Sequence, residues 1–115
     1  MTIQERAIGP IAVLDLSGRL VLGDGDGLLK DTVSGLVAQG RKQILLNVAD
    51  VSYVDSSGLG ALVAIFLATR KDGGVLKLLS PSKRLHDLLK MARLLTVLEV
   101  CETEDQALSA FGVSA

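Results

Sequence analysis

Apolar residues gather in short runs, separated by longer segments in which they recur every three or four positions. The short runs have the length of β-strands and cover residues 3–8, 11–16, 43–48, 75–79 and 96–100. Gly9-Pro10 lies between the first two runs and predicts a turn, hence an antiparallel hairpin near a sheet edge. The run at 43–48 is apolar almost throughout, which is typical of a strand buried on both faces. Residues 17–19 mark the end of the second strand or a kink in it, and residues 50–54 form a connection.

Helical spacing predicts helices over about residues 27–39, 59–72 and 83–92, and a last one that begins near residue 103. We expect Asp24 or Asp26 to cap the first helix and Ser82 to cap the third. Thr103 and Gln106 match a capping box at the start of the last. Because strands and helices alternate after the hairpin, the pattern predicts an α/β fold with a mixed, mostly parallel sheet and about four helices.

The helix at 59–72 carries two apolar stripes. The stripe expected to face the core consists of Leu59, Leu62, Val63, Phe66 and Leu67. The other is made of smaller apolar residues: Gly58, Ala61, Ile65 and Ala68. A surface helix normally makes its second face polar, so this stripe either packs inside the fold or lets another protein approach closely. If exposed, it would be a docking surface.

Size and charge narrow the classes of function. The 115 residues, 49% of them hydrophobic, suffice for one domain over residues 1–115. The net charge of -1 provides no field for direct binding of nucleic acid or acidic membranes, and we expect the basic face of the third helix to be solvated. We expect no membrane span and no secretion signal. With Cys101 as the single cysteine, these features predict a cytoplasmic protein.

The residue types argue against catalysis. His86 is the only histidine, and the nucleophile-elbow pattern fails because Val54, not glycine, stands two residues before Ser56. One histidine and one distant cysteine do not make a metal site. The glycine-rich loop at 23–27 has neither the spacing of a dinucleotide fingerprint nor the ligands of a calcium loop. We therefore expect no catalytic residues, no cofactor and no metal, and a protein that is not an enzyme.

The stretch Asp55-Ser56-Ser57-Gly58-Leu59-Gly60 lies where an apolar run meets a predicted helix. One interpretation is that Asp55 or a serine simply caps that helix. The other is that the helix N-terminus tolerates an anion there, including a phosphate added to a serine. A phosphoserine carries about -1.5 to -2 charges at neutral pH, so a partner docked beside it would meet a desolvated dianion. Such a modification would act as a binding switch.

These residues resemble the STAS-domain anti-sigma factor antagonists of bacteria. The likeness rests on the hexapeptide at 55–60, with Ile44-Leu45-Leu46-Asn47-Val48 before it. It is supported by residues 16–20 (Leu-Ser-Gly-Arg-Leu), Gly73-Gly74, Ser80-Pro81 and Gln106-Ala107-Leu108. The resemblance spans nearly the whole chain and implies a single STAS domain whose helices lie mainly on one side of the sheet.

The resemblance also implies partner switching. The unmodified protein would bind an anti-sigma factor that is also a serine kinase, and so free a sigma factor. The kinase would use ATP to phosphorylate Ser56, and a serine phosphatase would reverse this. Asp55 and Ser57 would flank the acceptor. The residues expected at the docking surface are Gly58, Leu59, Ala61 and Ile65.

One departure concerns the kinase contact. Close relatives often carry an acidic residue after the Gly18-Arg19-Leu20 segment, where this chain has Val21, so Asp24 or Asp26 would have to substitute. Related STAS domains also serve as stressosome-type scaffold subunits or transport accessories without such a switch, and this alternative stays open. An exposed edge strand near the N-terminus predicts a monomer or a weak dimer.

Overall fold

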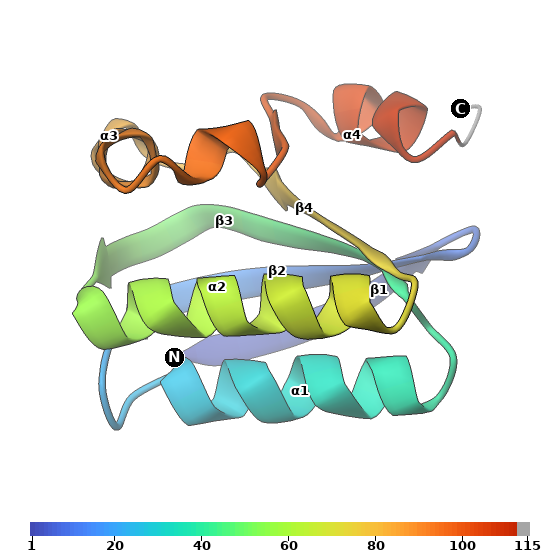
Figure 1. Cartoon of the computed structure of the whole chain (residues 1–115), viewed down its shortest axis with the longest axis horizontal. Coiled ribbons are helices and arrows are strands. Elements are labelled where there is room, and N and C mark those ends of the chain that lie inside the picture. The colour runs from blue at the N-terminus through green and yellow to red at the C-terminus, as the bar shows by residue number, and fades with distance from the viewer. Residues whose placement is uncertain (113–115) are drawn as a thin grey trace.

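Figure 1 shows the computed structural model, which describes residues 1–112. The strands are β1 (Thr2–Ile8), β2 (Ile11–Leu20), β3 (Gln43–Val54), β4 (Val75–Leu79) and β5 (Val100–Cys101). The helices are α1 (Asp26–Ala38), α2 (Ser56–Lys71), α3 (Lys83–Met91), the short 3-10 helix η1 (Leu94–Thr96) and α4 (Glu104–Ala110).

The strands form one sheet in the order β1-β2-β3-β4-β5. β1 runs antiparallel to β2, and the remaining neighbours are parallel. This confirms the predicted mixed, mostly parallel sheet with an N-terminal hairpin. A parallel pair needs a crossover between its strands, and α1, α2 and the α3–η1 segment supply these connections.

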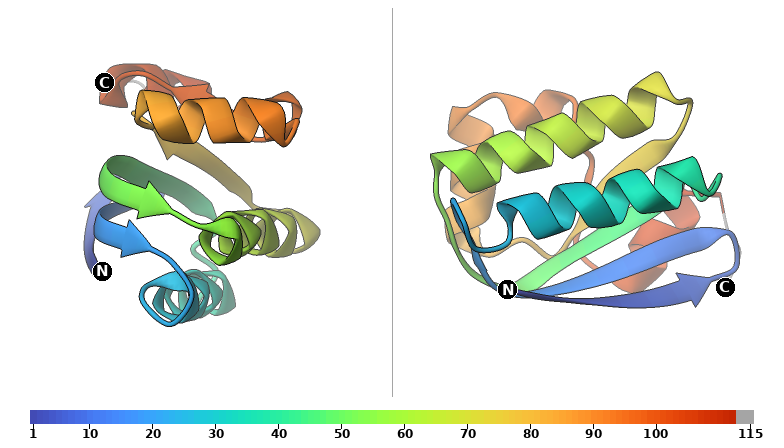
Figure 2. Two further views of the ribbon diagram at one scale, coloured as in Figure 1. Left: turned by 90° about the vertical axis from the view of Figure 1, so that its left-hand side faces the viewer. Right: turned by 90° about the horizontal axis from the view of Figure 1, so that it is seen from below.

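Helices cover both faces of the sheet. α1 and α2 lie side by side against one face, while α3 and α4 lie on the opposite side (Figures 1 and 2). Leu14 and Leu46 point into the larger core with α1 and α2, whereas Val13 and Leu45 point into a second core with α4. The expectation of helices mainly on one side is therefore wrong. The central strands are apolar on both faces, and each face needs a cover.

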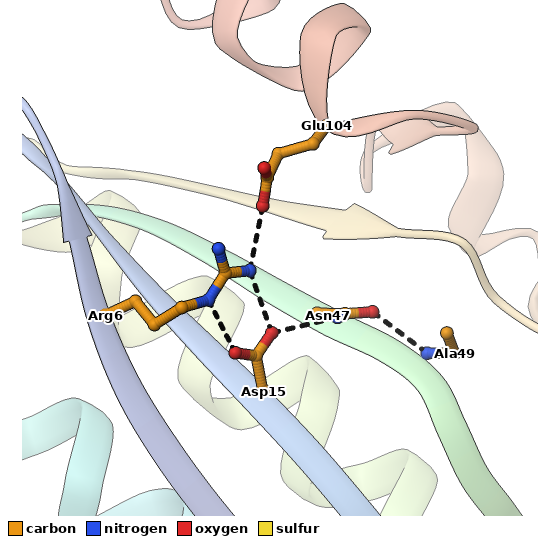
Figure 3. A network of polar contacts seen from close by, with 5 residues as sticks. All are labelled: Arg6, Asp15, Asn47, Ala49 and Glu104. Carbon is orange, nitrogen blue, oxygen red and sulfur yellow. Dashed lines mark hydrogen bonds and ion pairs between the residues drawn. The ribbon is translucent and has the colours of Figure 1, made fainter.

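A polar network joins β1 to α4 on the second face (Figure 3). The Arg6 guanidinium donates to both carboxylate oxygens of Asp15 on β2, at 2.6 and 3.0 Å, and to Glu104 at 2.8 Å. Asn47 on β3 donates to Asp15 at 2.8 Å. Arg6 first, and Asn47 to a smaller degree, lower the pKa of Asp15, against the opposing effect of burial. The network ties the edge strand to its neighbours by charge as well as by the backbone ladder.

β2 and β3 are longer than the sequence predicts. Residues 50–54 continue β3 instead of forming a connection, and they pair with residues 17–20 of β2. The pairing shifts register between Asp15 and Ser17 and again between Gly18 and Arg19. Gly18 has a φ of 109°, which a side chain rarely adopts. The alternative of a kink is thus the right one, because an irregular ladder lets both strands bend and run on.

Residues 96–100 are not a strand. The run forms η1 and a turn, and only Val100–Cys101 pairs with β4. Arg93 adopts a left-handed conformation that ends α3, and Leu98 is fully buried beneath the turn. A short apolar run reports burial, and its spacing does not distinguish a strand from a packed turn.

The caps are partly as expected. Ser82 accepts from the N–H of Leu85 and Thr103 from that of Gln106, both at 3.1 Å, which confirms these caps. The capping box is incomplete, because the Gln106 side chain accepts from the N–H of Glu102 instead of that of Thr103.

Neither Asp24 nor Asp26 caps α1. The cap position is Gly25, which has a φ of 105° and no side chain to offer. Asp24 pairs with the N-terminal ammonium of Met1 at 2.7 Å. Asp26 is the first helical residue, and its carboxylate accepts from the N–H of Gly23 at 3.2 Å. Because the helix begins at Asp26, the cap position falls on Gly25 and on neither aspartate.

The buried face of α2 takes residues from both predicted stripes: Leu62 comes from the first, and most of the small stripe packs inside while its Ala68 is exposed. The buried residues of this helix are Gly58, Ala61, Leu62, Ile65 and Thr69. Leu67, which the sequence assigns to the core, is 56% exposed. The reason lies at Gly58, where an added Cβ would stand 1.9 Å from the carbonyl oxygen of Leu20. The first turn of α2 approaches the end of β2 so closely that only glycine fits at position 58.

Gly58→Ala is expected to lower the free energy of unfolding by about 1–3 kcal/mol, because the methyl group meets backbone that cannot easily move. Gly60→Ala is the matched control. It lies in the same helix with nothing within 4 Å of an added Cβ, so the helix should gain about 0.5–1 kcal/mol. Urea unfolding of both variants measures the difference. A Gly58→Ala variant as stable as Gly60→Ala would contradict the close approach.

Candidate functional site

The two serines stand at the start of α2, directly after β3. Ser56 is the first helical residue and is exposed, while Ser57 is half-buried. Neither hydroxyl makes a hydrogen bond within residues 1–112. Ser56 therefore presents its hydroxyl to solvent from a fixed backbone position.

Asp55 fixes that position. Its Oδ1 accepts from the N–H of Gly58 at 2.8 Å, which makes it the N-cap, and its Oδ2 accepts from the N–H of Leu22 at 3.1 Å. Its own N–H donates to the carbonyl of Leu20 at 3.3 Å. The Gly58 N–H first, and that of Leu22 next, hold the pKa of Asp55 below its usual value. One carboxylate thus joins the start of α2 to the loop after β2.

The capping interpretation of Asp55 is confirmed, and it leaves the phosphate interpretation of Ser56 intact. A cap uses the carboxylate and the first free N–H groups of the helix. The serine hydroxyls are not needed for it.

A groove runs beside Ser56, between the start of α2 and helix α3. It is lined by Tyr53, Val54, Asp55, Ser56, Leu59, Arg84 and Leu88. Ser57 is not among these residues, so the structure distinguishes the two hydroxyls. Leu22, whose N–H is held by Asp55, is 73% exposed. Ser56 therefore lies among partly exposed apolar side chains contributed by separate parts of the chain.

The sequence-predicted docking residues are only partly brought together. Asp55, Ser56 and Leu59 line the groove, and Asp24 is exposed in the loop whose Leu22 is held by Asp55. The structure corrects the expectation for the small stripe. Gly58 is buried, Ala61 is 0% exposed and Ile65 is 3% exposed, so these residues support the surface from beneath.

Four residues of this surface were missed by the sequence analysis: Leu22, Tyr53, Arg84 and Leu88. The Arg84 guanidinium lies 4.9 Å from the centre of the Tyr53 ring, and that of Arg19 lies 5.9 Å from it. Nothing in the sequence pairs a residue at 84 with one at 53, because only the crossover from β4 to α3 brings them together. The one feature of the sequence that could have drawn attention to this surface is that Tyr53 is the single tyrosine of the chain.

Among residues 1–112, the groove beside Ser56 holds no histidine, and its one carboxylate, Asp55, is engaged as the helix cap. His86 is half-buried on α3 and does not line the groove. Within residues 1–112, no cluster of histidine, cysteine, aspartate or glutamate is placed to hold a metal ion. Cys101 is buried in the second core, and burial raises the pKa of its thiol. Over the same residues no helix has the length and apolarity to cross a membrane.

Comparison with known proteins agrees with the resemblance. A family model described as the STAS domain matches residues 2–107. The anti-sigma-B factor antagonist of Bacillus subtilis is 36% identical over 73 residues, which cover 64% of this chain and 66% of that protein. The alignment thus spans just under two thirds of that curated relative.

Two solved structures share the fold. The anti-sigma factor antagonist SpoIIAA in its unphosphorylated form has a TM-score of 0.77 and 21% identity, covering 96% of this chain and 98% of that one. The Bacillus cell fate determinant SpoIIAA in the phosphorylated form has a TM-score of 0.75 and 22% identity, covering 96% and 99%. These likenesses confirm the predicted STAS fold.

The capping role of Asp55 predicts a pH dependence of stability. Because the folded-state pKa of Asp55 is lowered, its ionised form stabilises the fold above about pH 4, and this contribution is lost as the pH falls through the folded-state pKa. Asp55→Asn does not titrate. The difference in unfolding free energy between wild type and Asp55→Asn should therefore be largest near neutral pH and shrink below about pH 4.

Urea unfolding across this pH range measures the difference. Asp31→Asn is the control, since Asp31 is exposed on α1 and its carboxylate accepts no hydrogen bond from the described residues. A difference for Asp55→Asn that stays constant with pH would contradict the assignment.

Proposed function

The chain belongs to the STAS domain family, and we propose that it is an anti-sigma factor antagonist switched by phosphorylation of Ser56. In its unphosphorylated form it binds an anti-sigma factor that is also a serine kinase, and a sigma factor is released. The kinase transfers the γ-phosphoryl group of ATP to the Ser56 hydroxyl, and a serine phosphatase restores the binding form. The protein itself contributes no catalytic residue, cofactor or metal.

The observation that carries this proposal is the position of Ser56. Its hydroxyl is exposed on the first residue of a capped helix, and it borders a groove with apolar walls. An exposed hydroxyl without a histidine beside it is suited to accept a phosphoryl group in a kinase active site, and is not arranged as the catalytic nucleophile of a hydrolase. Ser57 is half-buried and is not among the residues that line the groove, which favours Ser56 as the acceptor.

The switch follows from desolvation. The proposed contact surface consists of Leu22, Asp24, Ser56 and Leu59, with Asp55 and Ser57 at its base. A partner that buries the exposed Leu22 side chain gains apolar contact. The same partner would have to bury a phosphate on Ser56. A buried charge without a matching partner costs on the order of 2–5 kcal/mol of binding free energy, enough to dissociate a regulatory complex.

The first test compares charge variants of Ser56. Ser56→Ala should bind the cognate anti-sigma factor kinase as tightly as wild type, whereas Ser56→Asp should bind roughly thirtyfold or more weakly. Calorimetry with the purified anti-sigma factor kinases of the source organism measures both. Ser109→Asp is the control, because Ser109 is exposed on α4, on the other side of the sheet.

Phosphopeptide mapping after incubation with kinase and ATP should find phosphate on Ser56 and none in Ser56→Ala. Tight binding by Ser56→Asp, with Ser56 unmodified, would instead favour the scaffold or transport-accessory alternative.

A second test concerns the apolar part of the surface. Leu22→Ser should weaken kinase binding about tenfold or more while leaving thermal stability unchanged, because Leu22 is 73% exposed and has little core contact to lose. Leu67→Ser is the matched control. Leu67 is 56% exposed but lies on the last turns of α2, far along the helix from Ser56. Equal binding by the two variants would remove the loop after β2 from the contact surface.

A further inference from the structure

We propose that Arg84, stacked on Tyr53, is an intramolecular receptor for the phosphate of phosphorylated Ser56. This inference rests on the proposed function, since it concerns the modified form of the same site. It assigns a role to α3, whose basic face the sequence predicts to be solvated.

Position is the first argument. Arg84 lies in the first turn of α3 and Ser56 is the first residue of α2, yet both side chains line the same groove. The remaining lining residues are Tyr53, Val54, Asp55, Leu59 and Leu88. Arg84 is therefore the cationic side chain of the groove, and a phosphate on Ser56 would enter a space that already contains it.

The state of the Arg84 side chain is the second argument. Within residues 1–112 it is in no ion pair, so no carboxylate competes for it. Its guanidinium lies 4.9 Å from the centre of the Tyr53 ring. Stacking on an aromatic face fixes the guanidinium plane but leaves the N–H groups at its edges free to donate. Those edges are the donors that bind phosphate oxygens in pairs.

The carboxylate at the helix N-terminus is the third argument. An anion at this place would ordinarily accept from the first free N–H groups of the helix. Here Asp55 already takes the N–H of Gly58 at 2.8 Å, and the N–H of Leu22, in the loop after β2, donates to the same carboxylate at 3.1 Å. A phosphate on Ser56 would also stand next to the negative charge of Asp55. A cation from outside the helix offsets this repulsion, and Arg84 is the one that lines the groove.

A phosphate held by Arg84 would lie across the groove. The modified protein would then present a charged, occupied surface where the unmodified protein presents Leu59 and Leu88. The contact between Arg84 and the phosphate would also offset the repulsion between the phosphate and Asp55, so that the phosphorylated form stays folded. Arg19 on β2, whose guanidinium also lies near the Tyr53 ring, adds a second positive charge.

The test places phosphoserine at position 56 by genetic encoding and follows its phosphorus NMR shift against pH. The charged or titratable side chains around the phosphate are Tyr53 and Asp55 from β3 and its end, Arg84 from α3, and Arg19 beside the ring. A nearby guanidinium favours the dianion, so Arg84→Gln should raise the phosphate pKa by about half a pH unit.

Three further variants sharpen the result. Lys90→Gln removes a charge from the last turn of the same helix and should leave the titration unchanged. Tyr53→Phe keeps the aromatic face and should also leave it unchanged. Arg84→Lys keeps the charge but loses the flat fork, and it should retain less than half of the wild-type effect.

A phosphate titration that is the same in wild type and Arg84→Gln, or equally shifted by Lys90→Gln, overturns the proposal. Arg84→Lys decides the matter if Arg84→Gln fails to fold. Because encoded phosphoserine needs no kinase, this result is independent of the proposed function. If no anti-sigma factor kinase phosphorylates Ser56, the proposed function is overturned, while the phosphate titration still tests the contact with Arg84.

Discussion

The contact between Gly58 and the carbonyl of Leu20 is the constraint on which the site depends. No side chain fits between them, so the first turn of α2 lies directly on the end of β2. Asp55 secures this arrangement by accepting from Gly58 on one side and from Leu22 on the other. Helix start, strand end and loop therefore behave as one unit, and Ser56 is carried on it at the surface.

This close approach explains how α2 divides its faces. Gly58 faces β2 at backbone distance, and Ala61 and Ile65, three and seven residues further along the same side of the helix, follow it into the core. Larger residues such as Leu67 are left outside. The surface around Ser56 is consequently assembled from elsewhere, with Leu22 from the loop after β2 and Arg84 from α3. The partner surface proposed for this protein is a property of the fold and not of one helix.

The two proposals describe the same groove in two chemical states. Without phosphate, its apolar walls and the neighbouring Leu22 are available to a protein partner. With phosphate, the Arg84–Tyr53 pair supplies a positive charge that offsets the neighbouring Asp55 carboxylate. A single added group thus changes what the groove can bind, and the switch needs no rearrangement of the sheet.

The sequence by itself determined the class of fold and drew attention to Ser56. Apolar runs and helical spacing report local burial, so they predicted the hairpin, the mostly parallel sheet and the helix after β3, although α2 begins at Ser56 and not at residue 59. The hexapeptide at 55–60 led to the proposal for Ser56. Only the tertiary structure decided which residues of the two α2 stripes face inward, where β3 ends, and that Arg84 lies beside Tyr53. Both stripes of α2 are apolar, and the close approach at Gly58 fixes which side of the helix start faces β2. Contacts between distant segments leave no periodic signal in a single chain, because they arise from crossovers and not from local spacing.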